Sequence, residues 1–226
     1  MNSRQKDLLR IIVEEYIKTA EPVGSKLLVE KYGLDLSPAT VRNDMAELEA
    51  AGFLVQPFTS AGRVPTEAGY QYYIQQYIDL NKELKPSEKE KIINSNKNIG
   101  GNKEEMTKNL ARVLAEESGL GVFVGFDENN VYYTGLTNIF SQPEFHDLNL
   151  VHNMSRVLDH LDEVMEEIYE DVGEEVEVKI GHENPFASDC SAVVIKVKDT
   201  VLGVVGPMRM DYKQNISLMN FIKSII

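Results

Sequence analysis

Cysteine is almost absent from this sequence of 226 residues, and long apolar runs are absent altogether. Cys190, the single cysteine, has no partner for an internal disulfide or for a cysteine-ligated zinc cluster. No apolar stretch approaches the roughly 20 residues that cross a bilayer, and the first residues lack the uninterrupted apolar segment of a signal peptide. The sequence therefore predicts a cytoplasmic protein without structural disulfides and without a membrane partner.

The patterns of common catalytic and cofactor sites are missing as well. The sequence contains neither a P-loop nor a dinucleotide-binding fingerprint. Cys190 has no base tied to it, so we expect a small core residue at the start of a strand rather than a nucleophile. We therefore predict a protein that is not an enzyme and that carries no metal and no cofactor. The four histidines, which have no metal-ligand spacing among them, are His146, His152, His160 and His182.

A surplus of basic residues is also missing, because the formal net charge is −13. This value argues against nucleic-acid binding, which depends on cations placed against phosphates. The acidity is uneven, however. Residues 1–85 hold ten Lys and Arg against twelve Asp and Glu, whereas residues 86–226 hold thirteen against twenty-four. A nearly neutral N-terminal part can still bind DNA if its cations share one face, and the acidic remainder then weakens non-specific binding.

Two helices are predicted at the start of the chain. Apolar residues at helical spacing indicate an amphipathic helix over residues 4–19, and residues 21–24 end it. We expect Ser25 to cap a second, short helix through Tyr32. Gly33 ends this helix, because glycine suits the left-handed conformation that closes helices.

A third helix, from Pro38 to about Ala51, has two different faces. Its start is well marked, since Ser37 suits the N-cap and proline suits the first helical position. The apolar face comprises Val41, Met45 and Leu48. The opposite face is small and hydrogen-bonding, and comprises Ala39, Arg42, Asn43 and Ala46.

A hairpin and a fourth helix complete the first domain. Residues 53–55 have the composition of a strand, and residues 56–64 have the turn residues of an exposed hairpin. The fourth helix begins near Pro65-Thr66 and carries aromatic and apolar residues on one face. Three helices, a hairpin and a closing helix therefore form a domain over residues 1–80.

The remainder of the chain is predicted as a linker and a second domain. Residues 81–109 are rich in Lys, Glu, Asn and Ser, and we expect a linker that is in part helical. Over residues 110–226, a helix that ends near Gly119 precedes the order strand-strand-helix-strand-strand-strand-helix, which indicates an α+β domain with an antiparallel sheet. The expected elements are strands 122–126 and 131–136 around a turn at 127–130, a long helix 148–169, strands 176–180, 192–197 and 201–205, and a final helix capped by Asp211.

The third helix carries side chains that suit DNA. Arginine can bond guanine and asparagine can bond adenine with two hydrogen bonds each, so Arg42 and Asn43 are expected to read bases. Hydroxyl groups at a helix N-terminus suit phosphate oxygens. A capped amphipathic surface helix has the same spacing, so periodicity alone does not separate the two interpretations. With the hairpin included, the expected contact residues are Ser37, Ala39, Thr40, Arg42, Asn43, Thr59, Ser60 and Arg63.

Eight blocks of sequence carry a family resemblance. In the N-terminal part they are Val23-Gly24-Ser25-Lys26 and residues 37–49 and 56–66. In the C-terminal part they are residues 135–139, 142–145, 180–185, 189–191 and 206–212. In this order, the blocks resemble the HrcA family of heat-inducible transcription repressors. The last block has two open interpretations, a strand-to-helix turn capped by Asp211 or the rim of a ligand or subunit contact.

The resemblance implies a winged helix-turn-helix domain followed by a GAF-like domain, with residues 110–226 serving regulation and dimerisation. It implies a repressor that binds, as a homodimer, the double-stranded inverted-repeat operator called CIRCE upstream of chaperone operons. It adds a GroE-type chaperonin as a partner that restores the active form after heat. A symmetric dimer matches a palindromic site, because the spacing of the half-sites follows that of the two recognition helices.

The sequence departs from the family mainly in its C-terminal part. Typical members are considerably longer and carry an inserted dimerising domain, whereas here Ser118-Gly119-Leu120 runs almost directly into the hairpin before Gly135. Phe58 and Gln71 stand where members often place more polar or basic residues. DNA recognition is expected to be intact, but the dimer interface and the chaperonin response are in question. Two alternatives stay open: a small-molecule-responsive regulator of other genes with the same DNA-binding domain, and a protein-interaction module that docks a chaperone.

Overall fold

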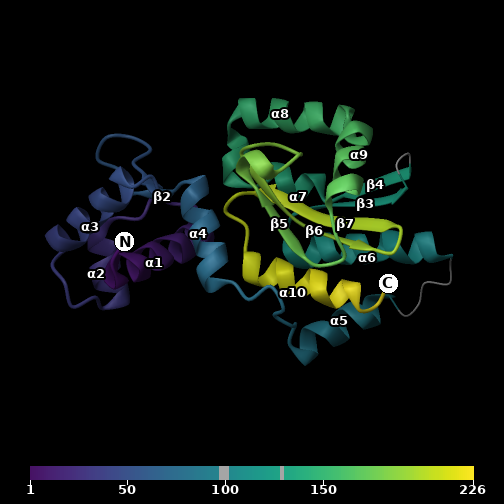
Figure 1. Cartoon of the computed structure of the whole chain (residues 1–226), viewed down its shortest axis with the longest axis horizontal. Helices are drawn as coiled ribbons and strands as arrows, with labels where there is room; N and C mark the ends of the chain where they lie inside the picture. Colours follow the sequence, from purple (N-terminus) through teal and green to yellow (C-terminus); the bar gives the residue numbers. More distant parts are fainter. Residues whose placement is uncertain (97–101, 128–129) are drawn as a thin grey trace. The chain divides into compact units, whose positions relative to one another are not determined.

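The computed structural model describes residues 1–96, 102–127 and 130–226 and divides into unit 1, Met1–Ile78, and unit 2, Asp79–Ile226 (Figure 1). The predicted turn at 127–130 lies partly outside the described residues. Within these three described ranges, no helix has the length and apolar character needed to cross a membrane.

Unit 1 begins with three helices close to their predicted positions: α1 (Ser3–Thr19), α2 (Ser25–Tyr32) and α3 (Pro38–Ala50). Gly33 ends α2 at a left-handed φ of 61°, as expected. The predicted cap of α2 is wrong, because Gly24 occupies the N-cap and Ser25 is the first helical residue. Gly24 is extended there and has no side chain to cap with, so the start of α2 rests on tertiary contacts, and Ser25 is buried.

A two-stranded antiparallel hairpin and a closing helix follow in unit 1. The strands are β1 (Leu54–Val55) and β2 (Val64–Pro65), and the helix is α4 (Glu67–Tyr77). Thr66 caps α4, since its side chain accepts a hydrogen bond from the backbone of Gly69. The core residues of unit 1 with no more than 2% exposure include Leu9, Ile12, Val13, Leu28, Val41, Leu48, Leu54, Tyr70 and Tyr73.

Much of the segment predicted as a linker is helical. It contains α5 (Pro86–Asn96) and the start of α6 (Lys103–Ser118). Leu84 and Ile92 are buried, and the side-chain amide of Asn220 donates to the backbone oxygens of Leu80 and Lys82. The described residues of this segment therefore pack within unit 2.

Unit 2 is built on a five-stranded sheet in which every pair of neighbours is antiparallel. Its order is β4 (Asn130–Thr134), β3 (Gly121–Asp127), β7 (Thr200–Pro207), β6 (Cys190–Val197) and β5 (Glu177–Ile180). A short 3-10 turn, η2 (Gly181–Glu183), follows β5. The antiparallel α+β arrangement predicted for this part of the chain is confirmed. Gly203 in β7 has no room for a side chain, because a Cβ there would meet the ring of Phe123.

One face of the sheet is covered by α7 (Leu136–Phe140), the 3-10 turn η1 (Pro143–His146), α8 (Leu148–Asp159) and α9 (Leu161–Asp171). The single helix predicted over 148–169 is wrong, because it breaks at His160, whose φ of −122° and ψ of 35° are not helical. The break lets Leu161 and Met165 of α9 join Met154 of α8 in one core cluster.

The other face of the sheet is covered by α6 and α10 (Tyr212–Lys223), and Figure 1 shows these two helices on the side opposite to α8 and α9. As predicted, Asp211 caps α10, accepting a hydrogen bond of 3.0 Å from the backbone of Gln214. The sheet is thus buried on both faces, and its central strand β7 is buried along its whole length.

Candidate nucleic-acid interface

Helix α3 presents the face that the sequence assigns to DNA. The oxygen of Ser37 accepts a hydrogen bond of 3.1 Å from the backbone of Thr40, and the two hydroxyl groups lie 2.9 Å apart. Arg42 and Asn43 are exposed, and neither makes a hydrogen bond or an ion pair with any residue that the structure describes. Ala39 is exposed beside them. This face is therefore unoccupied within the described part of the chain and is rich in donors.

The opposite face of α3 anchors the helix on α1. Val41, Met45 and Leu48 are at most 3% exposed, as the sequence predicts. Asp44 is also buried, and its carboxylate pairs at 2.7 Å with the guanidinium of Arg4 on α1. Apolar burial and this ion pair together fix the orientation of the exposed face.

Glu49, near the end of α3, ties both arms of the hairpin to the helix. One of its carboxylate oxygens accepts a hydrogen bond of 3.1 Å from the backbone of Gln56, and the other accepts one of 2.8 Å from Arg63 Nε. Arg63 also exchanges two backbone hydrogen bonds of 2.9 Å with Val23. A Cβ at Gly62 would collide with the backbone of Val23, so glycine is required for this close approach.

The tip of the hairpin is a tight turn. The backbone of Ala61 donates to the oxygen of Phe58 at 3.0 Å, and the side chain of Gln56 donates to the oxygen of Ala61 at 3.0 Å. Ser60 adopts a positive φ of 70°, an uncommon conformation for a residue with a side chain. Thr59 and Ser60 are exposed at this tip.

A groove of about 540 Å³ lies between the start of α2, the middle of α3 and the hairpin. It brings together three of the predicted contact residues, Arg42, Ser60 and Arg63. The other five are not part of its lining; they are Ser37, Ala39, Thr40, Asn43 and Thr59.

The lining residues that were not predicted as contact residues include two with long polar side chains, Lys26 and Gln56. The side chain of Lys26 is 80% exposed, and its Nζ lies 3.7 Å from Oε1 of Glu30. Lys26 belongs to the family block 23–26 and lies in the first turn of a predicted helix. These two features could have marked it as a contact residue from the sequence.

The acidic residues of unit 1 are largely occupied inside the unit. The carboxylate of Glu15 accepts hydrogen bonds from Lys31 at 2.7 and 2.8 Å and from the hydroxyl of Tyr32 at 2.6 Å. The hydrogen bonds from Lys31 and then Tyr32 hold the pKa of Glu15 below its ordinary value. Burial, together with the bond to Glu15, raises the pKa of Tyr32 to about 12. The Glu15 carboxylate is therefore charged but screened locally by Lys31, and it is held away from the exposed face of α3 by these bonds within the unit.

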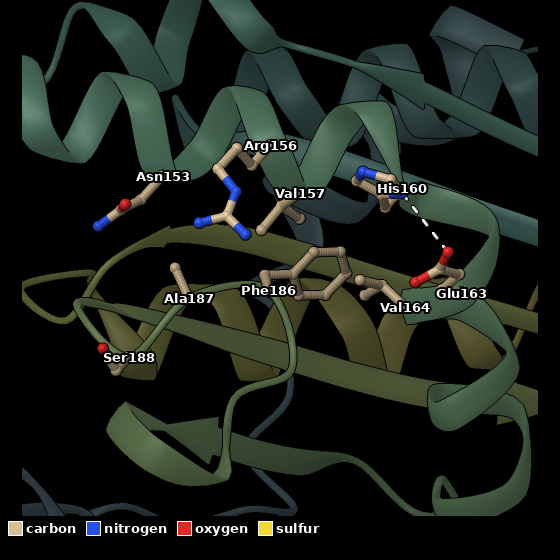
Figure 2. A pocket seen from close by; sticks show the side chains of 9 residues that line it. All are labelled: Asn153, Arg156, Val157, His160, Glu163, Val164, Phe186, Ala187 and Ser188. Carbon is tan, nitrogen blue, oxygen red and sulfur yellow. Dashed lines mark ion pairs between the residues drawn. The ribbon is translucent and has the colours of Figure 1, made fainter.

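Unit 2 contains a separate groove of about 460 Å³ between α8, α9 and the loop before β6 (Figure 2). Val157, Val164 and Phe186 form its apolar part, and Arg156 and His160 stand on its rim. Arg156 makes no ion pair with any described residue. This groove has the size of a small-molecule site.

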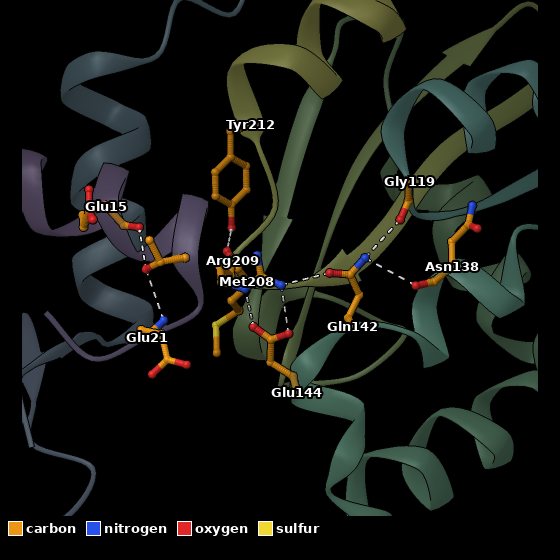
Figure 3. A network of polar contacts seen from close by, with 10 residues as sticks. Glu15, Glu21, Gly119, Asn138, Gln142, Glu144, Met208, Arg209 and Tyr212 are labelled. Atoms are coloured by element: carbon orange, nitrogen blue, oxygen red, sulfur yellow. Dashed lines mark hydrogen bonds and ion pairs between the residues drawn. The ribbon is translucent and has the colours of Figure 1, made fainter.

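The block 206–212 lies in a polar network rather than on an open rim (Figure 3). Arg209 donates to both carboxylate oxygens of Glu144, at 2.6 and 3.2 Å, and to the side-chain oxygen of Gln142 at 2.9 Å. Gln142 in turn donates to the backbone oxygen of Gly119. The hydroxyl of Tyr212 lies 2.8 Å from that of Ser191 and donates to the oxygen of Met208. The network connects the block to η1 and to the end of α6, which favours the structural interpretation.

The exposure of the cysteine and of the histidines bears on the remaining chemical candidates. Cys190 is 3% exposed and belongs to the core cluster, and burial raises the pKa of its thiol to about 12, which agrees with the predicted core role. The side chains of His152 and His160 are exposed, as expected for α8 and its end. No group of three or more potential metal ligands was found among the residues that the structure describes.

The chain is similar to known proteins along most of its length. The family model described as "HrcA protein C terminal domain" matches residues 74–216. The "Heat-inducible transcription repressor HrcA" of Halalkalibacterium halodurans is 26% identical over 325 residues, and the alignment covers 97% of this chain and 94% of that protein. The protein of the same name from Alkaliphilus metalliredigens is 50% identical over 84 residues, which is 37% of this chain and 24% of that protein.

The first of these alignments is longer than the chain itself, which has 226 residues, so parts of that relative have no counterpart here. A solved structure titled "Crystal structure of a hypothetical protein at 2.2 A resolution" has a TM-score of 0.74 and 18% identity. The alignment covers 100% of this chain and 97% of the chain in that structure. At this identity, the likeness shows the fold alone.

Proposed function

We propose that this protein, which belongs to the HrcA family, is a transcription repressor of heat-shock genes that binds an inverted-repeat operator through unit 1. The observation that carries the proposal is the exposed face of α3. Arg42 and Asn43 stand on it without partners among the described residues, beside a groove that also holds Lys26. Exposed donors on a helix that is fixed against α1 suit base edges and phosphates, which supports the DNA-binding interpretation over that of a simple surface helix.

The arrangement of unit 1 supports a winged helix-turn-helix assignment. Helices α2 and α3 would form the helix-turn-helix, with α3 entering the major groove, and the β1–β2 hairpin would form the wing. In this geometry Arg42 and Asn43 reach base edges. The small side chain of Ala39 lets the backbone of α3 approach the DNA closely.

The phosphate contacts of this proposal come from several elements around α3. Ser37 and Thr40 lie at the N-terminus of α3, where hydroxyl and backbone N–H groups favour a phosphate. Thr59 and Ser60 lie on the wing, and Lys26 adds a cation from α2.

Arg63 has two roles in the proposal, one structural and one electrostatic. Its side chain is 15% exposed and pairs with Glu49, so it holds the wing against α3 as well as contributing positive potential to the groove. Its removal should therefore weaken binding to all sequences, because it disturbs the position of the wing and not a base contact.

Unit 2 would supply dimerisation and regulation as a GAF-like domain over residues 110–226. Its antiparallel sheet between two helical layers supports this assignment. A homodimer suits a palindromic operator, because two copies of α3 then meet two half-sites. The GroE-type chaperonin stays a prediction from the family resemblance.

The groove in Figure 2 favours a second candidate function, a repressor whose signal is a small molecule bound by unit 2. A ligand that binds only the native state raises the melting temperature. A thermal-shift screen against metabolites is the test, with Arg156→Ala, at an exposed position of the lining, as the control that should reduce any shift arising in this groove. If no metabolite raises the melting temperature, this candidate is rejected and temperature remains the proposed signal.

The primary proposal is tested by titrating the protein onto a duplex with an inverted repeat at several salt concentrations. Phosphate contacts release counterions, so the logarithm of the affinity should fall linearly with the logarithm of the salt concentration. A flat salt dependence, or equal affinity for unrelated duplexes, would contradict an operator-binding role and would favour a protein-docking module.

A further inference from the structure

Phe58 stands in water at the tip of the β1–β2 hairpin, where 65% of its surface is exposed. Exposure of an aromatic ring is unfavourable, since its burial removes a large apolar area from water. The tip of the hairpin therefore carries an apolar side chain whose transfer out of water is favourable in free energy.

The hairpin holds this ring on a rigid support. The backbone bond from Ala61 to Phe58 closes the turn, and Gln56 braces the turn through its side chain. Glu49 then ties Gln56 and Arg63, one on each arm, to α3. A ring presented on such a support loses little conformational freedom when it binds.

The surroundings of Phe58 favour a polar partner with apolar interior surfaces. Thr59 and Ser60 are exposed next to it, and the groove behind the hairpin is lined by Lys26, Arg42 and Arg63. Protein-docking surfaces are usually contiguous apolar patches. A single exposed ring with hydroxyl groups next to it, on a hairpin that borders a groove lined by cations, instead matches the minor groove of DNA. There, apolar side chains enter between base steps while cations of the same protein contact phosphates.

We propose that Phe58 is an apolar wedge that enters the minor groove beside each half-site and partly unstacks one base step. This inference rests on the proposed DNA-binding function and adds a specificity element to it. Pyrimidine–purine steps are the easiest to unstack. Phe58 therefore makes the protein prefer such a step under the wing without any hydrogen bond to a base.

The test starts with duplexes that the wild-type protein selects from a random pool, and compares wild type with Phe58→Ala. The variant should bind the selected duplexes about tenfold more weakly, and its preference at the step under the wing should disappear. Its salt slope should stay unchanged, because no phosphate contact is lost. Phe58→Leu keeps an apolar side chain and should lie between the two proteins.

Two substitutions serve as matched controls. Lys26→Ala should lower the salt slope by about one while keeping the step preference, since it removes a phosphate contact and not the wedge. Val55→Ala, at another exposed apolar position of the hairpin, should change neither property. 2-Aminopurine placed at the preferred step reports unstacking directly, and its fluorescence should rise with wild type but not with Phe58→Ala.

Equal affinity and equal step preference of wild type and Phe58→Ala would overturn the wedge. So would a loss of self-association in sedimentation with unchanged DNA binding, because Phe58 would then be a protein contact. If the wild-type protein enriches no duplex, the proposed function itself fails and the wedge fails with it. Since Phe58 is exposed, both variants should melt at the wild-type temperature. If Phe58→Ala melts at a lower temperature, the comparison of wild type with Phe58→Leu tests the wedge instead.

Discussion

The two units of the chain differ in how they carry charge. Unit 1 has eight Lys and Arg against ten Asp and Glu, whereas unit 2 has fifteen against twenty-six. In unit 1, carboxylates pair internally, as in Asp44 with Arg4 and Glu15 with Lys31, while Arg42 is left without a partner among the described residues. Each internal pair uses one cation and one anion and leaves the net charge of unit 1 at −2. Binding therefore depends less on the net charge of the chain than on which cations stay unpaired and exposed on one face.

The largest effect that can separate the units is a cavity in one core. Leu48→Ala removes a side chain with no exposure under α3 and should destabilise unit 1 by about 2–5 kcal/mol. Hydrogen exchange should then show lost protection within residues 1–78 and unchanged protection in the sheet of unit 2. Ile195→Ala in β6, also fully buried, should give the opposite pattern. Equal loss in both units after either change would show that they unfold as one.

A smaller effect tests the internal pairing of the acidic groups. Glu15→Gln removes the charge that Lys31 and Tyr32 stabilise and should cost unit 1 about 1.5–3 kcal/mol near neutral pH. Because the pKa of Glu15 is lowered in the folded protein, its stabilisation is complete above the ordinary value of about 4.5.

This stabilisation is lost as the pH falls through the lower pKa of the folded state. The stability difference between wild type and Glu15→Gln, measured by denaturant titration, should therefore shrink below pH 4 or so. Glu21→Gln, at an exposed position of the same unit, is the matched control and should show no such change. A pH-independent difference would mean that the Glu15 cluster stabilises by packing and not by charge.

The smallest effect concerns a single exposed cation of unit 1. Lys26→Ala should weaken operator binding by less than tenfold and lower the salt slope by about one, because one phosphate contact is removed. Lys103→Ala, an exposed lysine in the first turn of α6, tests whether any lost cation has this effect. Equal losses from both changes would assign the effect to overall charge and not to the groove.

Local signals were sufficient to predict most helices and strands. Ser37-Pro38 marks the start of α3, Gly33 marks the end of α2, and Asp211 marks the start of α10, since each has a physical preference for that position. Short apolar runs bounded by turn residues predicted all five strands of the sheet. Within the described residues, the face of α3 that carries Arg42 and Asn43 was also readable from spacing.

The features that escaped prediction depend on tertiary contacts. The break at His160 has no proline or glycine signal, and it follows from packing α9 onto the sheet. The expectation of part-helical structure within 81–109 agrees with α5 and the start of α6. The packing of the described residues there within unit 2 was not predicted, because it depends on two isolated apolar residues, Leu84 and Ile92, which are buried in unit 2. The pair between Glu49 and Arg63 joins the end of α3 to the second arm of the hairpin, a contact that depends on how the hairpin folds back, so sequence alone assigned Arg63 wholly to DNA.

The central claim is that the exposed face of α3 reads base sequence, and two arginines that line the same groove allow a direct test. Binding of wild type, Arg42→Ala and Arg63→Ala should be measured on a panel of duplexes that differ one base pair at a time. Arg42→Ala should lose about 1–3 kcal/mol and relax the preference at one position, whereas Arg63→Ala should weaken binding to all duplexes alike. If Arg42→Ala keeps the wild-type preference at every position, α3 does not read the operator.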